Sequence, residues 1–185
     1  MLRAEWEFRA TTMTKIPPVH ELRYLKIAKN YRELTGNLSC LGIDSDNIQE
    51  YSNHIYDCWF KLAEEHLDEA KKALLASSTR SIFSRSYYAA YNASKAMRYF
   101  ANGTVSLKGD DHGKASVDLP DDLTNVADFS ANITILYEYR LRADYDNWSD
   151  TFKNKTLTPN EAVEMAEEFV EAVRKYMSEK FGIPL

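Results

Sequence analysis

The feature that most constrains the fold is the spacing of apolar residues, which recur every three or four positions along most of the chain. The clearest run is Ile48, Tyr51, Ile55, Trp59 and Leu62. Only six glycines and five prolines occur among the 185 residues, and they cluster outside these periodic segments. No segment shows the convincing alternation of a half-buried strand. The pattern predicts an all-α protein.

Start and stop signals divide the periodic residues into five helices. The expected ranges are about 18–34 with a stop at Gly36, 45–76, 78–101, 119–147 with Pro120 in its first turn, and 159–181. Thr158, Pro159 and Glu161 give the clearest start, because a threonine N-cap with glutamate three residues later forms a capping box.

The links between these helices predict an antiparallel helical bundle, because most of them are short and polar. The exception is the loop over 102–118, which is long for a bundle connection and is a candidate functional segment. We expect residues 1–43, a leader and the first helix, to form an N-terminal extension packed on a bundle domain of residues 44–185.

Composition and charge exclude several classes of protein. No apolar run approaches the ~20 residues of a membrane span, and no signal peptide is evident, so we expect a cytoplasmic protein. The net charge of −5 argues against bulk nucleic-acid binding but allows a local basic site. Cys40 and Cys58 lack metal-type spacing and are expected to be reduced thiols. No motif indicates a metal or a cofactor.

The helix over 78–101 carries a polar strip of Arg85, Tyr88, Asn92 and Lys95, spaced three, four and three residues apart. One interpretation is a solvated helix face. The other is a recognition strip or a buried polar network, which the tyrosine and asparagine favour because they are unusual on an ordinary exposed helix.

Arg140 falls where the next helix requires an apolar side chain. The apolar ladder of that helix is Val126, Phe129, Ile133 and Leu136. Its next steps reach Arg140 and Ala143, so Arg140 is expected to point inward, which is costly unless it is paired. Asp144, four residues later, is a candidate partner. The pair is either a structural clamp between helices or part of an anion or phosphate site, to which arginine is well suited.

Three segments in this order resemble HEPN domains (higher eukaryote and prokaryote nucleotide-binding). They are AEEHLDEAKKAL, then SRSYYAAYNASKAM, and, after a loop with a lone histidine, RLRADYD. The resemblance covers about residues 60–175. It implies an all-α bundle that commonly dimerises and is often encoded beside a partner nucleotidyltransferase. Many members are metal-independent ribonucleases of toxin–antitoxin or defence systems, and others are non-catalytic.

The ribonuclease motif of that family is an arginine followed, after four to six residues, by a histidine. Arg140 matches the arginine, which binds phosphate in the family, but Tyr145 stands five residues on and no histidine follows. Tyrosine is a poor base at neutral pH, since its ordinary pKa is about 10. His112, in the glycine-rich loop, is the other acid–base candidate, although a lone loop histidine is more often a cap or turn residue.

The sequence therefore favours a non-catalytic HEPN-like module, not an enzyme, that binds a nucleotide, RNA or a partner protein. The expected partners are a second copy of the chain and a nucleotidyltransferase antitoxin. The expected binding residues are Arg140, Asp144, Arg142, Arg85, Tyr88 and Asn92. The first alternative is a divergent metal-independent ribonuclease that uses Arg140 with Tyr145 or His112. The second is a structural helical adaptor.

Overall fold

The structure, a computed structural model, describes residues 28–40, 42, 45–101, 103, 105, 109–148, 151–152 and 156–183. Within these ranges the chain is helical and has no strand, so the predicted all-α fold class is confirmed. The elements are α3 (Tyr31–Ser39), α4 (Ser45–Leu75), α5 (Thr79–Phe100), the 3₁₀ helix η1 (Gly109–Lys114), α6 (Val126–Tyr145) and α7 (Pro159–Phe181). No helix in these ranges has the length and apolarity that crossing a membrane requires.

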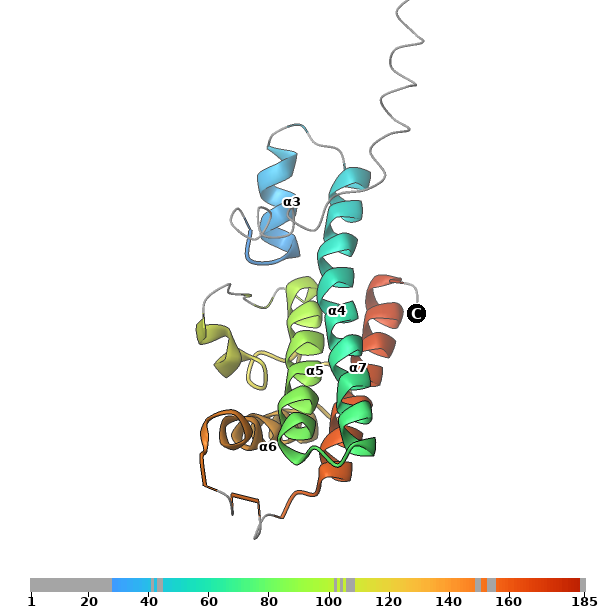
Figure 1. Ribbon diagram of the computed structural model, residues 1–185. Coiled ribbons are helices and arrows are strands. Elements are labelled where there is room, and N and C mark those ends of the chain that lie inside the picture. Colours follow the sequence, from blue (N-terminus) through green and yellow to red (C-terminus); the bar gives the residue numbers. More distant parts are fainter. Residues whose placement is uncertain are drawn as a thin grey trace, which may run out of the picture.

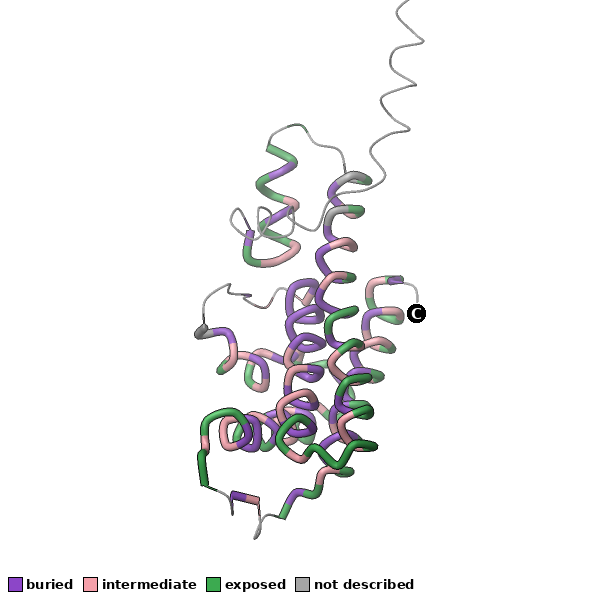
Figure 2. The backbone as a smooth tube through the Cα atoms, in the orientation of Figure 1, coloured by how far each residue is buried: buried purple, intermediate pink, exposed green. Residues whose placement is uncertain are grey.

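Helix α5 is the centre of the bundle and packs against α4, α6 and α7 (Figure 1). It runs antiparallel to α4, and α6 crosses the same bundle near one end. Every residue over 92–100 is buried (Figure 2). Ala89, Ala90, Ala93 and Ala96 of α5 are fully buried, and their small side chains let the neighbouring helices approach closely.

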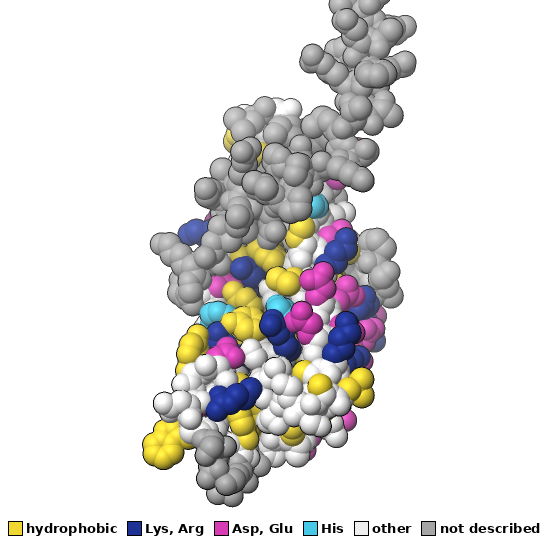
Figure 3. All heavy atoms as spheres, viewed as in Figure 1, with side chains coloured by type: hydrophobic (Ala, Val, Ile, Leu, Met, Phe, Trp, Pro, Cys, Tyr) yellow, Lys and Arg dark blue, Asp and Glu magenta, His cyan; other side chains and the backbone are white. Residues whose placement is uncertain are grey.

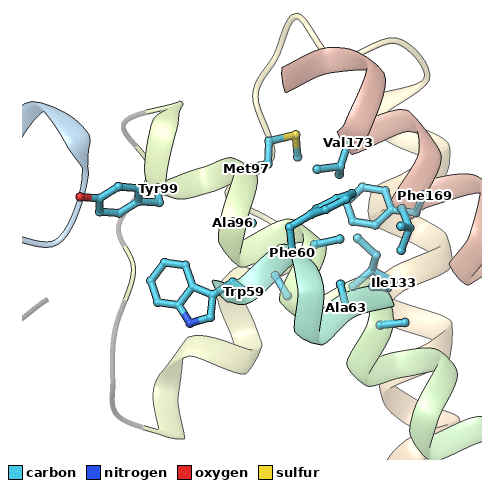
Figure 4. Close-up of a cluster of buried hydrophobic side chains, with 14 of the residues drawn as sticks. Trp59, Phe60, Ala63, Ala96, Met97, Tyr99, Ile133, Phe169 and Val173 are labelled. Atoms are coloured by element: carbon cyan, nitrogen blue, oxygen red, sulfur yellow. The ribbon is translucent and has the colours of Figure 1, made fainter. Parts of the chain in front are cut away.

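The main apolar core collects side chains from four helices (Figure 4). Phe60 of α4, Met97 of α5 and Ile133 of α6 gather there with Phe169 and Val173 of α7, and each is at most 6% exposed. Burying one such side chain contributes roughly 1.5–3 kcal/mol. The cluster therefore fixes α6 against α5 and α7.

The helix expected over 18–34 is placed wrongly in the part that the structure describes. Helix α3 begins only at Tyr31, because the Asn30 side chain caps it by accepting a hydrogen bond from the Glu33 amide at 2.9 Å. The helix then passes through Gly36, the expected stop, since a glycine inside a helix costs only about 1 kcal/mol. The glycine that adopts a left-handed conformation after this helix is Gly42, at φ 75°. Residues 18–27 lie outside the described ranges.

The fourth helix was also predicted to begin too early. Residues 119–125 form turns, so Pro120 precedes the helix, and α6 begins at Val126 after Asn125 in a left-handed conformation at φ 60°. Leu119 and Leu123 are buried and four residues apart, a spacing that also occurs in helices. Within the loop expected over 102–118, the chain forms η1.

The other three helices lie within two residues of their predicted bounds. The capping box of α7 is present: Thr158 Oγ1 accepts from the Glu161 amide at 3.3 Å, and Glu161 Oε2 accepts from the Thr158 amide at 2.7 Å. A capping box involves residues only three apart in the sequence, so it can be predicted without knowledge of the fold.

Candidate functional site

Arg140 points inward, as the ladder of α6 predicts, and only 8% of the residue is exposed. Its guanidinium is held between two tyrosine rings, since Cζ lies 5.1 Å from the ring centroid of Tyr88 on α5 and 5.1 Å from that of Tyr145. Nη2 donates to Tyr88 Oη at 2.5 Å and to Tyr145 Oη at 3.4 Å. The arginine thus links the end of α6 to the middle of α5.

The expected ion pair between Arg140 and Asp144 is present, with Nε 2.8 Å from Oδ2. The N–H bond of Nε is not aligned with the carboxylate, so this is an ion pair without a well-formed hydrogen bond. No described residue accepts a hydrogen bond from Nη1. Burial would lower the pKa of Arg140, but the hydrogen bond to Tyr88 and the Asp144 charge outweigh it and raise the pKa. The group therefore stays charged.

His112 lies in a cage of tyrosine rings beside this arginine. Its Nδ1 is 2.8 Å from Tyr87 Oη, and its ring stacks on Tyr91 with centroids 4.4 Å apart. The Tyr88 ring, which contacts Arg140, also contacts the His112 ring with centroids 6.1 Å apart. Burial and then the Arg140 charge lower the pKa of His112, so the imidazole is neutral near pH 7. The loop histidine and the helix arginine therefore share one site.

A buried ion pair fastens the segment that carries His112. Arg98 Nη2 donates to Asp111 Oδ2 at 2.9 Å and Nη1 donates to Oδ1 at 3.3 Å, and both side chains are fully buried. Tyr91 Oη also donates to Asp111 Oδ2 at 3.1 Å. Asp111, the residue directly before His112, is thus bound by two residues of α5.

Arg80 of α5 holds the last turn of α6. Its Nη1 donates to the carbonyls of Ala143 at 2.8 Å and Arg142 at 3.2 Å, and its Nη2 donates to the Trp148 carbonyl at 3.4 Å. The last carbonyls of a helix have no partner within the helix, so a cation there satisfies them and suits the helix dipole. Arg80 in this way supports the turn that carries Asp144 and Tyr145.

The polar strip of α5 is not a uniformly solvated face, because two of its members are buried. Asn92 is 5% exposed and its amide donates to the Tyr88 carbonyl at 2.8 Å. Lys95 is 8% exposed, with Nζ 4.8 Å from the Trp59 ring centroid. Arg85 is the outermost member, and it is bound to helix α4 by an ion pair between its Nε and a Glu69 oxygen 3.1 Å away.

The expected binding residues divide into two groups. Tyr88 and Asp144 contact Arg140, whereas no contact joins Arg85 or Asn92 to it among the described residues. Tyr145, the acid–base candidate of the ribonuclease alternative, also contacts Arg140. Arg142 projects differently, because residues two apart on a helix differ by about 200°. Its Cζ lies 5.6 Å from the ring centroid of Tyr139.

Sequence reasoning missed the residues that surround His112. Tyr87, Tyr91, Tyr137 and Asp111 all contact its ring or anchor its segment. The available signals were the three tyrosines of the YYAAY segment and a tyrosine one turn before Arg140. Only the fold brings them together, because the loop must return to α5 to do so.

On the face drawn in Figure 3, basic and acidic side chains are interspersed, so no broad basic surface lies there. In the described ranges no cluster of three or more His, Cys, Asp or Glu residues could hold a metal ion. The polar groups that this site offers are its arginine, its histidine and its tyrosine hydroxyls. These groups can bind an anion with donors and stack against a planar group.

Comparison with known proteins identifies one family. A family model described as HEPN domain matches residues 56–176, about two thirds of the chain. This range contains α5, η1 and α6, and with them Tyr88, His112 and Arg140. No match was found among the curated proteins or among the solved structures.

Proposed function

The chain belongs to the HEPN domain family, and on that premise we propose that it is a non-catalytic module that binds a phosphate group of a nucleotide or RNA at Arg140. One observation carries the proposal. A buried, charged guanidinium keeps donor capacity at Nη1, because Nη2 donates to Tyr88 and Tyr145 while Nε only forms an ion pair with Asp144. Arginine presents a planar fork of donors that matches phosphate oxygens, so a phosphate would complete its coordination.

The surroundings of Arg140 support a ligand with a planar base. Tyr145 is 71% exposed and presents its ring beside the guanidinium. Bases stack on such rings, and each stacked base contributes about 1–3 kcal/mol. A phosphate on Arg140 with a base against Tyr145 would use both features.

Family membership alone supports the wider setting. We propose that the protein acts as a cytoplasmic homodimer in a toxin–antitoxin or defence system, with a nucleotidyltransferase as partner. The N-terminal residues 1–43 would form an extension packed on the bundle domain.

The binding proposal is tested with a fluorescently labelled short RNA and a nucleoside monophosphate, by anisotropy and calorimetry. We expect Arg140→Ala to weaken binding by about ten- to a hundredfold, because hydrogen bonds to charged groups contribute about 1.5–3 kcal/mol. Arg142→Ala is the matched control, since it removes an arginine from the same helix turn but not from the site, and we expect wild-type affinity.

Thermal melting of the same variants separates binding from the structural alternative. If Arg140 and Asp144 only tie helices together, the melting temperature of Arg140→Ala collapses while binding per folded molecule stays at the wild-type level. That outcome would favour the structural helical adaptor and refute the phosphate site.

A divergent metal-independent ribonuclease is the second candidate, because Arg140 and His112 both contact the Tyr88 ring. We expect the purified protein not to cleave RNA, since no histidine completes the family motif on α6. Cleavage that disappears in both Arg140→Ala and His112→Ala, and that persists after contaminating nucleases are removed, would establish the second candidate instead.

A further inference from the structure

We propose that Tyr87 is a positioning residue whose buried hydroxyl donates to Nδ1 of His112 and holds the imidazole proton on Nε2. The ring then presents a hydrogen-bond donor, and not a base, to an anion at Arg140. The claim that an anion binds at Arg140 rests on the proposed function, whereas the claim about the tautomer of His112 does not.

The direction of the hydrogen bond follows from the burial of Tyr87, which is 0% exposed. Its Oη has one proton to donate, and the partner within reach among the described residues is His112 Nδ1 at 2.8 Å. If Nδ1 carried the proton instead, the tyrosine hydroxyl would be a buried donor without an acceptor there, which is unfavourable. Burial raises the pKa of Tyr87, so the hydroxyl keeps its proton.

The imidazole is also confined in position. The Tyr91 ring stacks on it, and the Tyr137 ring of α6 is nearly parallel to it, with an interplanar angle of 21° and centroids 6.1 Å apart. The charged groups that act on the ring are Arg140, Asp111 and Lys95. Burial and the two cations outweigh the carboxylate and keep the imidazole neutral, so it has a single N–H.

Fixing that proton on Nε2 has a chemical consequence. A neutral imidazole with Nδ1 accepting from a phenol has no lone pair left to take a proton from a substrate hydroxyl. In this proposal the Nε2–H is the donor that remains for a phosphate oxygen bound at Arg140. The imidazole would then offer a donor and no base, which agrees with a binding module.

The tautomer is measured directly by ¹⁵N NMR of the histidine side chains in the full chain without ligand. We assign His112 by the loss of its signals in His112→Gln. We expect Nδ1 at the position of an unprotonated ring nitrogen and Nε2 at that of a protonated one. In Tyr87→Phe we expect a mixture of both tautomers, while Tyr137→Phe, which removes a hydroxyl from another ring contact of His112, keeps the wild-type pattern.

Binding of inorganic phosphate and of a nucleoside monophosphate gives the second readout. We expect Tyr87→Phe to weaken binding about two- to tenfold, the contribution of one hydrogen bond. His112→Gln should retain binding within about threefold, because its amide can donate near the position of Nε2, whereas His112→Ala should lose about tenfold. Circular dichroism and melting curves identify the variants that are folded.

The outcomes separate the two proposals. An Nδ1–H tautomer in the wild-type protein, or a pattern that Tyr87→Phe leaves unchanged, overturns this inference whether or not phosphate binds. The Nε2–H tautomer without any binding of phosphate or nucleotide overturns the proposed function and supports the role of Tyr87.

Discussion

The buried ion pair between Arg98 and Asp111 should be the most sensitive contact near the site. In Asp111→Asn the side chain keeps its size but loses its charge, so the fully buried Arg98 guanidinium loses the Asp111 carboxylate. The same change weakens the acceptor of the Tyr91 hydroxyl. We expect a large loss of stability and a displaced η1 segment, because the next residue is His112.

The magnitude follows from the burial of both partners. Each side chain is 0% exposed and two hydrogen bonds join them, at 2.9 and 3.3 Å. Removing one member of such a pair costs about 3–5 kcal/mol, because a buried charge loses its partner. For a chain of this size each 1 kcal/mol lowers the melting temperature by about 2–4 °C, so we expect a decrease of about 6 to 20 °C.

Differential scanning fluorimetry and urea denaturation measure this loss. Asp68→Asn is the matched control, because it breaks an ion pair with Lys72 whose side chains are 60% and 70% exposed, and we expect no measurable change. In the double variant Arg98→Met/Asp111→Leu part of the stability should return, since the buried guanidinium is removed together with the carboxylate. A melting temperature of Asp111→Asn within about 2 °C of wild type would refute the reasoning.

Three further predictions concern the ends of helices and the effect of pH. Arg80→Ala should cost about 1 kcal/mol and speed amide hydrogen exchange in the last turn of α6, whose carbonyls it caps. Thr158→Ala should lower the free energy of unfolding by about 1 kcal/mol in urea titrations, because it removes the N-cap of α7. Since the pKa of His112 is lowered in the folded protein, its contribution to stability is complete above the ordinary histidine pKa of about 6.5 and is lost as the pH falls below it. Urea denaturation at pH values above and below that point measures this loss. The free energy of unfolding should decrease less with falling pH in His112→Gln than in the wild-type protein.

The inward position of Arg140 could be predicted because helical periodicity is a local property. Steps of three and four residues from Leu136 reach Arg140 whatever the rest of the fold does, and Asp144 follows from the same spacing. The bounds of α4, α5 and α7 could be predicted for the same reason, because they depend on local start and stop signals. Where local signals are ambiguous the prediction failed: Asn125 in a left-handed conformation separates α6 from the turns before it.

The relation between His112 and Arg140 could not be predicted, since it depends on tertiary structure. The loop histidine approaches α5 because Arg98 binds Asp111, and no periodicity or motif in the sequence pairs those two residues. The YYAAY segment looked like a helix face, but whether its rings meet solvent, a helix or a loop depends on where η1 lies. Side chains that face a long connection are therefore the least predictable part of this site.

The net charge of −5 and an anion site are compatible because the two act over different distances. Much negative charge lies on the exposed face of α7, at Glu164, Glu167, Glu168 and Glu171. Exposed charges are largely screened beyond about 8 Å at physiological ionic strength, whereas a guanidinium between tyrosine rings acts at short range in a medium of lower dielectric constant. A site of this kind makes one or two phosphate contacts, so its affinity should fall with salt at a logarithmic slope of about 1 to 2. A protein that binds RNA through a broad basic surface has a much steeper slope, because it releases many counterions.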